Sequence, residues 1–270
     1  MFTKYSSILL IIFLLNIGYA AAQTQESSDL LEKTQSEAKP YRIGAGIGYT
    51  FHGYREETDL PLNRYLNTLI FIADANIEKG NFLYSLNFGI LSGQNNSISL
   101  YNNEEFFTYY QRESSVLRIY LENALDYRHW GTQTFPGYIG GAIRADFYFS
   151  YLEQTIYYNI TGIISLNIHA TQKWIINEKN SIVFSASLPI FGYALRPPYF
   201  GLLYTPFDIE GRIVSLHNYL AFFGDIKYQY KLNTLVSLYS NLGFELSSIG
   251  FPQPRRDAAF RITTGAAFTF

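Results

Sequence analysis

From residue 41 to the end of the chain, apolar side chains recur at every second position, in about ten segments separated by polar turns. This spacing places alternate side chains on opposite faces of a β-strand. In the first segment Ile43, Ile47 and Phe51 share one face, whereas Arg42 lies on the other. No later window approaches the roughly 20 consecutive apolar residues that a membrane-spanning helix needs. The chain is therefore expected to be all-β, and any membrane span must be made of strands.

The expected strands are joined alternately by short and long connections. We predict strands near residues 41–51, 66–77, 82–90, 115–127, 137–150, 160–176, 181–193, 213–230, 234–247 and 258–270. The connections at 78–81, 177–180 and 231–233 are tight and the one at 128–136 is slightly longer, whereas long connections are expected at 52–65, 93–113, 151–159, 194–212 and 248–257. Pro189 cannot donate a ladder hydrogen bond, so a bulge or kink is expected in the seventh strand.

The last eight residues, TTGAAFTF, combine Gly265 with aromatic residues at Phe268 and Phe270. This ending resembles the C-terminal β-signal of bacterial outer-membrane β-barrel proteins. The resemblance implies a transmembrane antiparallel up-and-down β-barrel of about 10 strands, with short periplasmic turns and long extracellular loops. It also implies outer-membrane lipid as the surroundings and the barrel-assembly machinery as a partner of the C-terminal strand.

The first 22 residues have the layout of a secretory signal peptide. Lys4 precedes an apolar run from Ile8 to Leu15, and three alanines end at Ala22. Such a short run with small residues at its exit is typical of a cleaved signal, so we predict cleavage after Ala22 and export to the bacterial outer membrane. Residues 23–40 are polar and lack aromatic side chains, and we expect a flexible periplasmic segment there. Residues 41–270 then form the barrel.

Composition excludes several classes of function. The chain has no cysteine, which removes disulfides, thiolate metal sites and cysteine nucleophiles. A net charge of -2 does not favour binding to nucleic acid, because a nucleic-acid-binding protein would carry a basic stripe. Its 24 tyrosines and 22 phenylalanines fit the aromatic girdles of a membrane barrel. We therefore expect a monomer without cofactor or metal.

The less apolar faces of the strands carry charges of both signs, which a membrane barrel would enclose. A barrel of about ten strands is little wider than the eight-stranded kind, whose interior is filled by side chains. We predict a paired charge network that fills the lumen and opposes free diffusion of solutes. Its predicted members are Arg42, Asp74, Arg118, Glu122, Asp126, Arg144, Asp146, His169, Lys173, His217, Asp225, Lys227, Glu245 and Arg261.

Alternation alone does not decide which face is wet. A soluble lipocalin-like barrel or secreted sandwich also alternates, with its apolar face turned inward. The C-terminal pattern and the alternating loop lengths favour the membrane barrel over this alternative.

Candidate catalytic residues are few. The omptin proteases also have ten strands, and they activate water between an Asp pair and an Asp-His pair. In this sequence His217 and Asp208 are the nearest candidates for such a site. The Asp-x-His spacing and the partner Asp pair are missing, however. Ser215 and His217 are two residues apart, in the reverse order of the outer-membrane phospholipases. His169 has no second ligand beside it at metal-binding spacing. No catalytic residue is assigned, and enzymatic activity stays open.

The long connections carry the remaining indications of function. Residues 193–208 are rich in aromatic residues and proline, which suits a lid, a contact with lipopolysaccharide or a partner site. Aromatic residues in 93–113 are better explained by strands that continue above the membrane. We expect a non-enzymatic role in surface interaction, adhesion or envelope structure, with a possible extracellular ligand. The alternatives are a narrow channel or transporter for small or hydrophobic solutes, and an omptin-like or lipid-modifying rim enzyme.

Overall fold

The computed structural model describes residues 41–56, 62–98, 113–152, 158–196, 210–250 and 254–270. The predicted signal peptide, the 23–40 segment and Asp208 lie outside them. The described part of the chain contains no helix that could cross a membrane. Its strands are β1 (Tyr41–Glu56), β2 (Leu62–Lys79), β3 (Phe82–Ile98), β4 (Glu113–Trp130), β5 (Gly137–Leu152), β6 (Tyr158–Ile175), β7 (Asn180–Arg196), β8 (Glu210–Ser215), β9 (Tyr219–Lys231), β10 (Val236–Ile249) and β11 (Arg255–Thr269).

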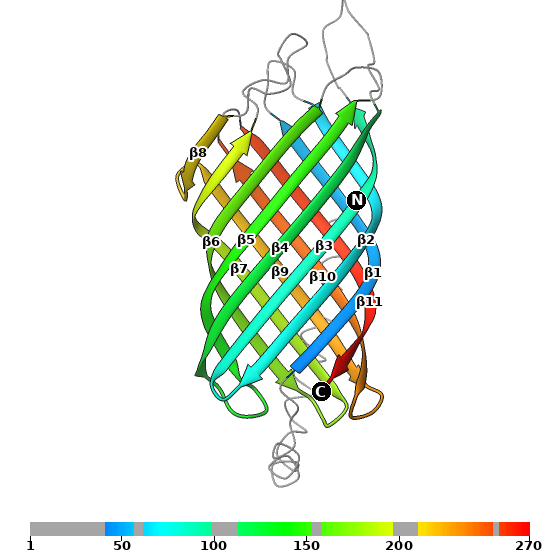
Figure 1. Ribbon diagram of the computed structural model, residues 1–270, viewed down its shortest axis with the longest axis vertical. Helices are drawn as coiled ribbons and strands as arrows, with labels where there is room; N and C mark the ends of the chain where they lie inside the picture. The colour runs from blue at the N-terminus through cyan, green and yellow to red at the C-terminus, as the bar shows by residue number, and fades with distance from the viewer. Residues whose placement is uncertain (1–40, 57–61, 99–112, 153–157, 197–209, 251–253) are drawn as a thin grey trace, which may run out of the picture.

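Ten of these strands form a closed antiparallel barrel, as predicted (Figure 1). The ring runs β6-β5-β4-β3-β2-β1-β11-β10-β9-β7 and closes through pairing of β6 with β7. The first and last strands pair along their whole length. At the inner end Phe270 N donates to Tyr41 O over 2.9 Å, Tyr41 N donates to Phe270 O over 3.2 Å, and the two rings stack.

The apolar face of the alternation is turned outward and the charged face inward. Phe260, Leu242 and Ile168 expose 42%, 41% and 48% of their surface, whereas Arg144 exposes 3%. The soluble alternative, with apolar side chains inside, is therefore wrong for the strands described.

Aromatic side chains of the barrel lie in pairs. The paired rings are Tyr41–Phe270, Phe82–Tyr127, Phe135–Trp174, Tyr49–Phe51 and Phe222–Phe244. Many aromatic side chains on the outer surface are typical of the interfacial girdles of a membrane barrel.

Several strands are longer than the alternation predicts. β3 continues to Ile98, so part of the long connection expected at 93–113 is strand, and β1 continues to Glu56. Outward-facing side chains become polar there: Asn67, Ser92 and Gln94 are exposed. These strands continue beyond the apolar band because a hairpin outside the membrane needs only its backbone hydrogen bonds and polar side chains.

The bulge expected at Pro189 is confirmed, but the single strand predicted at 213–230 is wrong. The β6–β7 register shifts where Leu166 faces Phe191 and Asn167 faces Pro189. The predicted eighth strand is divided into β8 and β9 by a turn in which Asn218 bonds Ser215 through backbone and side chain, at 3.0 and 2.8 Å. One continuous strand would place Val214 on the outer face with Leu216 and Leu220. The turn interrupts the alternation, and Val214 instead faces inward and is fully buried.

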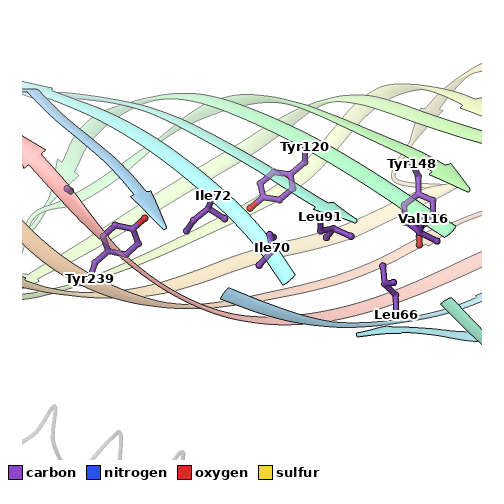
Figure 2. Packing of buried hydrophobic residues seen from close by; sticks show 9 residues of the cluster. Leu66, Ile70, Ile72, Leu91, Val116, Tyr120, Tyr148 and Tyr239 are labelled. Carbon is purple, nitrogen blue, oxygen red and sulfur yellow. The ribbon is translucent and has the colours of Figure 1, made fainter. Parts of the chain in front are cut away.

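Apolar side chains also enter the lumen. A cluster of buried, mostly apolar side chains points into the lumen (Figure 2). Its members are Leu66, Ile70, Ile72, Leu91, Val116, Tyr120, Tyr148, Tyr239 and Ala267. The interior is therefore packed with rings and aliphatic groups as well as charges.

Gly265 of the C-terminal pattern faces Tyr239 across the β10–β11 ladder. A Cβ at position 265 would lie 2.2 Å from Ala45 O and 2.7 Å from Tyr239 Cζ. We expect Gly265→Val to destabilise the barrel by about 1–3 kcal/mol through overpacking. The measurement is the denaturant midpoint of the refolded barrel, with outward-facing Ala266→Val as the matched control. Equal midpoints for the two variants would contradict this prediction.

Candidate functional site

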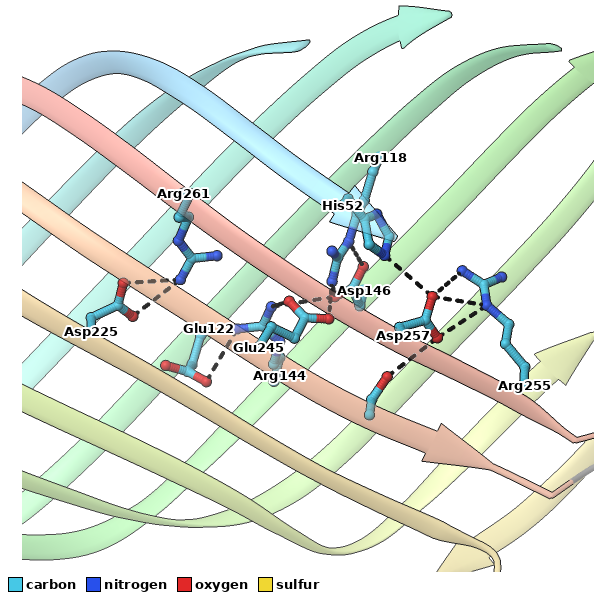
Figure 3. Close-up of polar contacts among 11 residues, drawn as sticks. His52, Arg118, Glu122, Arg144, Asp146, Asp225, Glu245, Arg255, Asp257 and Arg261 are labelled. Atoms are coloured by element: carbon cyan, nitrogen blue, oxygen red, sulfur yellow. Dashed lines mark hydrogen bonds and ion pairs between the residues drawn. The ribbon is translucent and has the colours of Figure 1, made fainter. Parts of the chain in front are cut away.

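The centre of the lumen holds a network of arginines and carboxylates (Figure 3). Arg118 Nε donates to Asp146 Oδ1 over 2.8 Å, its Nη2 bonds the other oxygen of Asp146, and Nη2 also donates to Glu245 Oε1 over 2.6 Å. Arg144 lies 3.3 Å from Asp146 and 3.6 Å from both Glu122 and Glu245. Each charge is thus placed beside opposite charge, which buried ions require.

These contacts cross the barrel. In the ring of strands β4 and β10 are five places apart in either direction, so the Arg118–Glu245 bond joins opposite walls. A second crossing, towards the inner end, joins Lys227 of β9 to Asp74 of β2 over 3.3 Å, and Arg42 also pairs with Asp74. These pairs span the lumen at two levels.

A third crossing lies towards the inner end. Glu78 of β2 accepts hydrogen bonds from Lys173 of β6 over 2.9 Å and from Tyr138 of β5 over 2.7 Å. Glu78 was assigned to a turn in the sequence analysis, yet it supplies the partner of Lys173. Nearby, His169 Nδ1 lies 2.7 Å from Asp126 Oδ2.

Aromatic rings pack against the arginines of this network. The Arg144 guanidinium lies 3.9 Å from the ring centroid of Phe223 and 4.7 Å from that of Tyr120. Arg261 lies 5.1 Å from Tyr120 and donates to both oxygens of Asp225 at 3.0 and 3.1 Å. Cation–π contacts of this kind stabilise a desolvated cation. Two cavities between these groups measure about 10 and about 30 Å³, sizes that suit single water molecules.

The outer end holds a cluster that the sequence analysis placed in loops. His52 Nε2 lies 3.2 Å from Asp257 Oδ1, Arg255 Nη2 donates to the same oxygen over 2.7 Å, and Ser247 Oγ donates to Oδ2 over 3.3 Å. Arg255 also stacks on Tyr148 at 4.8 Å. The sequence does carry a pattern that predicts this cluster, because His52, Arg255 and Asp257 continue the alternation of β1 and β11 on the inward face.

Not every residue predicted for the network belongs to it. His217 lies in the turn between β8 and β9 and is exposed, because the two strands are not continuous. It therefore joins neither an ion pair of the lumen nor an arrangement with Ser215. Among the described residues no three His, Asp or Glu side chains are grouped as a metal site. Of the C-terminal pattern, Phe268 and Phe270 are exposed on the outer surface, at 59% and 54%.

No protein-family profile and no curated protein matches this sequence. Among solved structures, the outer membrane protease OmpT from Escherichia coli is similar, with a TM-score of 0.59 and 8% identity over 87% of this chain and 98% of that chain. The translocator domain of the autotransporter NalP from Neisseria meningitidis has a TM-score of 0.39 and 8% identity, over 94% and 97% of the two chains. Ail from Yersinia pestis has a TM-score of 0.33 and 11% identity, over 86% and 99%.

The likeness to OmpT extends to the fold alone. A closed barrel with an outward-facing apolar surface and an ionic interior is the arrangement of a bacterial outer-membrane β-barrel.

Proposed function

We propose that this protein is a non-conducting outer-membrane barrel that acts at the cell surface, in adhesion, surface interaction or envelope structure. The observation that carries the proposal is the set of ion pairs across the lumen, above all Arg118–Glu245 between opposite walls. Because these charges pair with opposite charges across the lumen, opening a path would separate buried ion pairs, at a cost of several kcal/mol.

The lengths of the strands support a function at the outer end of the barrel, where the long connections lie. β2 and β4 have 18 residues each, whereas about 9–11 suffice to cross the bilayer. With the usual strand tilt, 18 residues rise roughly 45 Å, about 20 Å more than the apolar band. The end of β2 and β3 that carries exposed Asn67, Ser92 and Gln94 is the end of the long connections. The barrel wall would hold those connections above the lipid surface.

The closed lumen is tested by conductance. We expect the purified barrel in planar bilayers to give no stepwise current. The double variant Arg118→Ser and Glu245→Ser removes one crossing and leaves those at Asp74 and Glu78, so we expect it to stay closed to small ions as well. Stepwise currents from the unchanged protein would overturn the proposal.

The surface role is tested with the connections 99–112 and 197–209, each replaced by a short Gly-Ser linker. Cells that display the unchanged barrel should bind immobilised collagen or fibronectin, or resist a hydrophobic dye, better than cells that display the replaced forms. The matched control replaces the short inner turn at residues 177–180 with a linker of the same kind. If all four forms give equal adhesion and equal dye entry, the surface role is wrong.

A further inference from the structure

The inner end of the barrel carries more positive than negative charge. Within the part of the chain that the structure describes, the charged side chains at this rim, apart from the Lys173–Glu78 pair, are four cations and one carboxylate. The cations are Lys79, Arg128, Lys179 and Lys231, and the carboxylate is Glu178. Arg128 is half-buried, whereas the other four are exposed. We call the four cations the basic rim.

The basic rim occupies two sides of the inner mouth. On one side Arg128 N donates to Asn81 O over 2.7 Å, which places the end of β4 beside the β2–β3 turn and Lys79. On the other side Lys231 N donates to Lys179 O over 2.8 Å. β2 and β9 are four places apart in the ring, and neighbouring strands lie about 4.8 Å apart, so the two sides are separated by roughly 20 Å along the wall. A segment that lies across the mouth meets cations at both edges.

The mouth between these two sides is polar and open to solvent. The Lys173–Glu78 pair crosses it from β6 to β2 with 29% and 40% of the two side chains exposed. Arg118 and Arg144 of the central network, by contrast, expose 6% and 3% of theirs. Because Lys173 and Glu78 neutralise each other, the basic rim leaves the field over the mouth positive, and such a field attracts an anionic partner.

The chain itself contains an acidic segment that is joined to this end. Residues 23–32 carry three carboxylates, at Glu26, Asp29 and Glu32, and no basic residue. The connecting residues 33–40 carry two lysines and one glutamate. The charge of residues 23–32, which we call the acidic segment, is therefore opposite in sign to that of the basic rim.

The place where the acidic segment is attached brings it within reach of the rim. Tyr41 begins β1 at the inner end and pairs with Ile77 of β2, two residues before Lys79. The eight residues 33–40 span at most about 30 Å when fully extended. This reach exceeds the roughly 20 Å that separates the two sides of the basic rim along the wall, so the acidic segment can contact both.

We propose that the acidic segment binds the basic rim through its carboxylates and lies across the inner mouth of its own barrel. Each contact is an exposed ion pair, which is weak alone and is screened by salt. The contacts act together because the tether holds the segment at an effective concentration on the order of millimolar. A separate anionic molecule lacks this advantage, so the segment of the same chain is the occupant that the rim favours.

The test measures disulfide formation between two introduced cysteines, since the chain has no cysteine of its own. Ser28→Cys lies within the acidic segment, and Thr234→Cys lies in the exposed β9–β10 turn, three residues after Lys231. The full chain is purified in a zwitterionic detergent at low protein concentration. A gel mobility shift on heating verifies that each variant is folded, and the rate of disulfide formation under mild oxidation is then measured.

Docking through charge predicts that the rate depends on salt and on the carboxylates. We expect disulfide formation to be several-fold faster at about 0.01 M salt than at about 1 M, where the Debye length is only about 3 Å. At low salt, the combined change Glu26→Gln, Asp29→Asn and Glu32→Gln should slow it several-fold. The double variant Lys179→Gln and Lys231→Gln should slow it as well.

The matched control is the double variant Lys33→Gln and Lys39→Gln, which removes charge from the connecting residues and should not slow disulfide formation. Equal rates at low salt for the unchanged and the neutralised acidic segment would overturn the proposal, because a tether without docking gives the same rate in both. If soluble polyglutamate also binds both forms equally, the basic rim serves a separate anionic partner, and the proposal is overturned in that case too.

Discussion

Replacing Arg144 by methionine is expected to lower the unfolding free energy of the barrel by about 3–5 kcal/mol, because it leaves buried carboxylates without their cation. Arg144 lies within 3.6 Å of Glu122 and Glu245 and within 3.3 Å of Asp146, and only 3% of its side chain is exposed. Methionine keeps much of the volume and the contact with Phe223 but none of the charge. The measurement is a denaturant titration of the barrel refolded in vesicles.

The control for this experiment is Lys179→Met. Lys179 is exposed in the turn before β7, so the same chemical change there should alter the unfolding free energy by less than about 0.5 kcal/mol. The triple variant Arg144→Met, Glu122→Gln and Glu245→Gln should recover part of the loss, since it removes unpaired charge. If Arg144→Met and Lys179→Met unfold at the same denaturant concentration, the network does not stabilise the barrel.

Leu242→Arg is expected to cost about 2–4 kcal/mol, because it places a charge on the lipid face in the middle of β10. Leu242 faces outward and pairs with Ile262 and Ile226 on the flanking strands. The effect should depend on depth. Leu232→Arg, in the exposed inner turn, makes the same substitution at the interface and should cost at most about 1 kcal/mol.

Two measurements check this prediction: the unfolding free energy in vesicles and the yield of heat-modifiable barrel. A loss for Leu242→Arg that disappears in mild detergent would show that the penalty comes from the hydrocarbon. Similar losses for Leu242→Arg and Leu232→Arg would mean that β10 does not face lipid, contrary to the orientation of the strands described above.

Much of the fold follows from local sequence. Alternation with a period of two assigns each residue of a regular strand to a face, and a polar turn ends it, so the strands from β1 to β6 are predictable. The division of 213–230 was missed because both sides of the turn alternate. The indication was Asn218, whose side chain bonds back to Ser215 N at 2.8 Å, a turn that asparagine favours.

The candidate site was less predictable. Sequence indicates that Arg118 and Glu245 face inward, but their contact depends on the order of strands in the ring and on its diameter, which no local pattern contains. His52, Arg255 and Asp257 were missed for another reason. They lie on strand extensions beyond the membrane, where the outward face becomes polar and the apolar signal that marks a strand fades.

The contacts across the lumen have a consequence for the order of folding. Arg118 and Glu245 are 127 residues apart in the chain, and Glu78 and Lys173 are 95 apart. A partly assembled sheet that lacks β9 to β11 would present Arg118 and Asp74 to its surroundings without Glu245 and Lys227. The final strands therefore complete the pairing across the lumen that β1 to β6 begin, which makes closure a cooperative and slow event that favours a complete ring over an incomplete one.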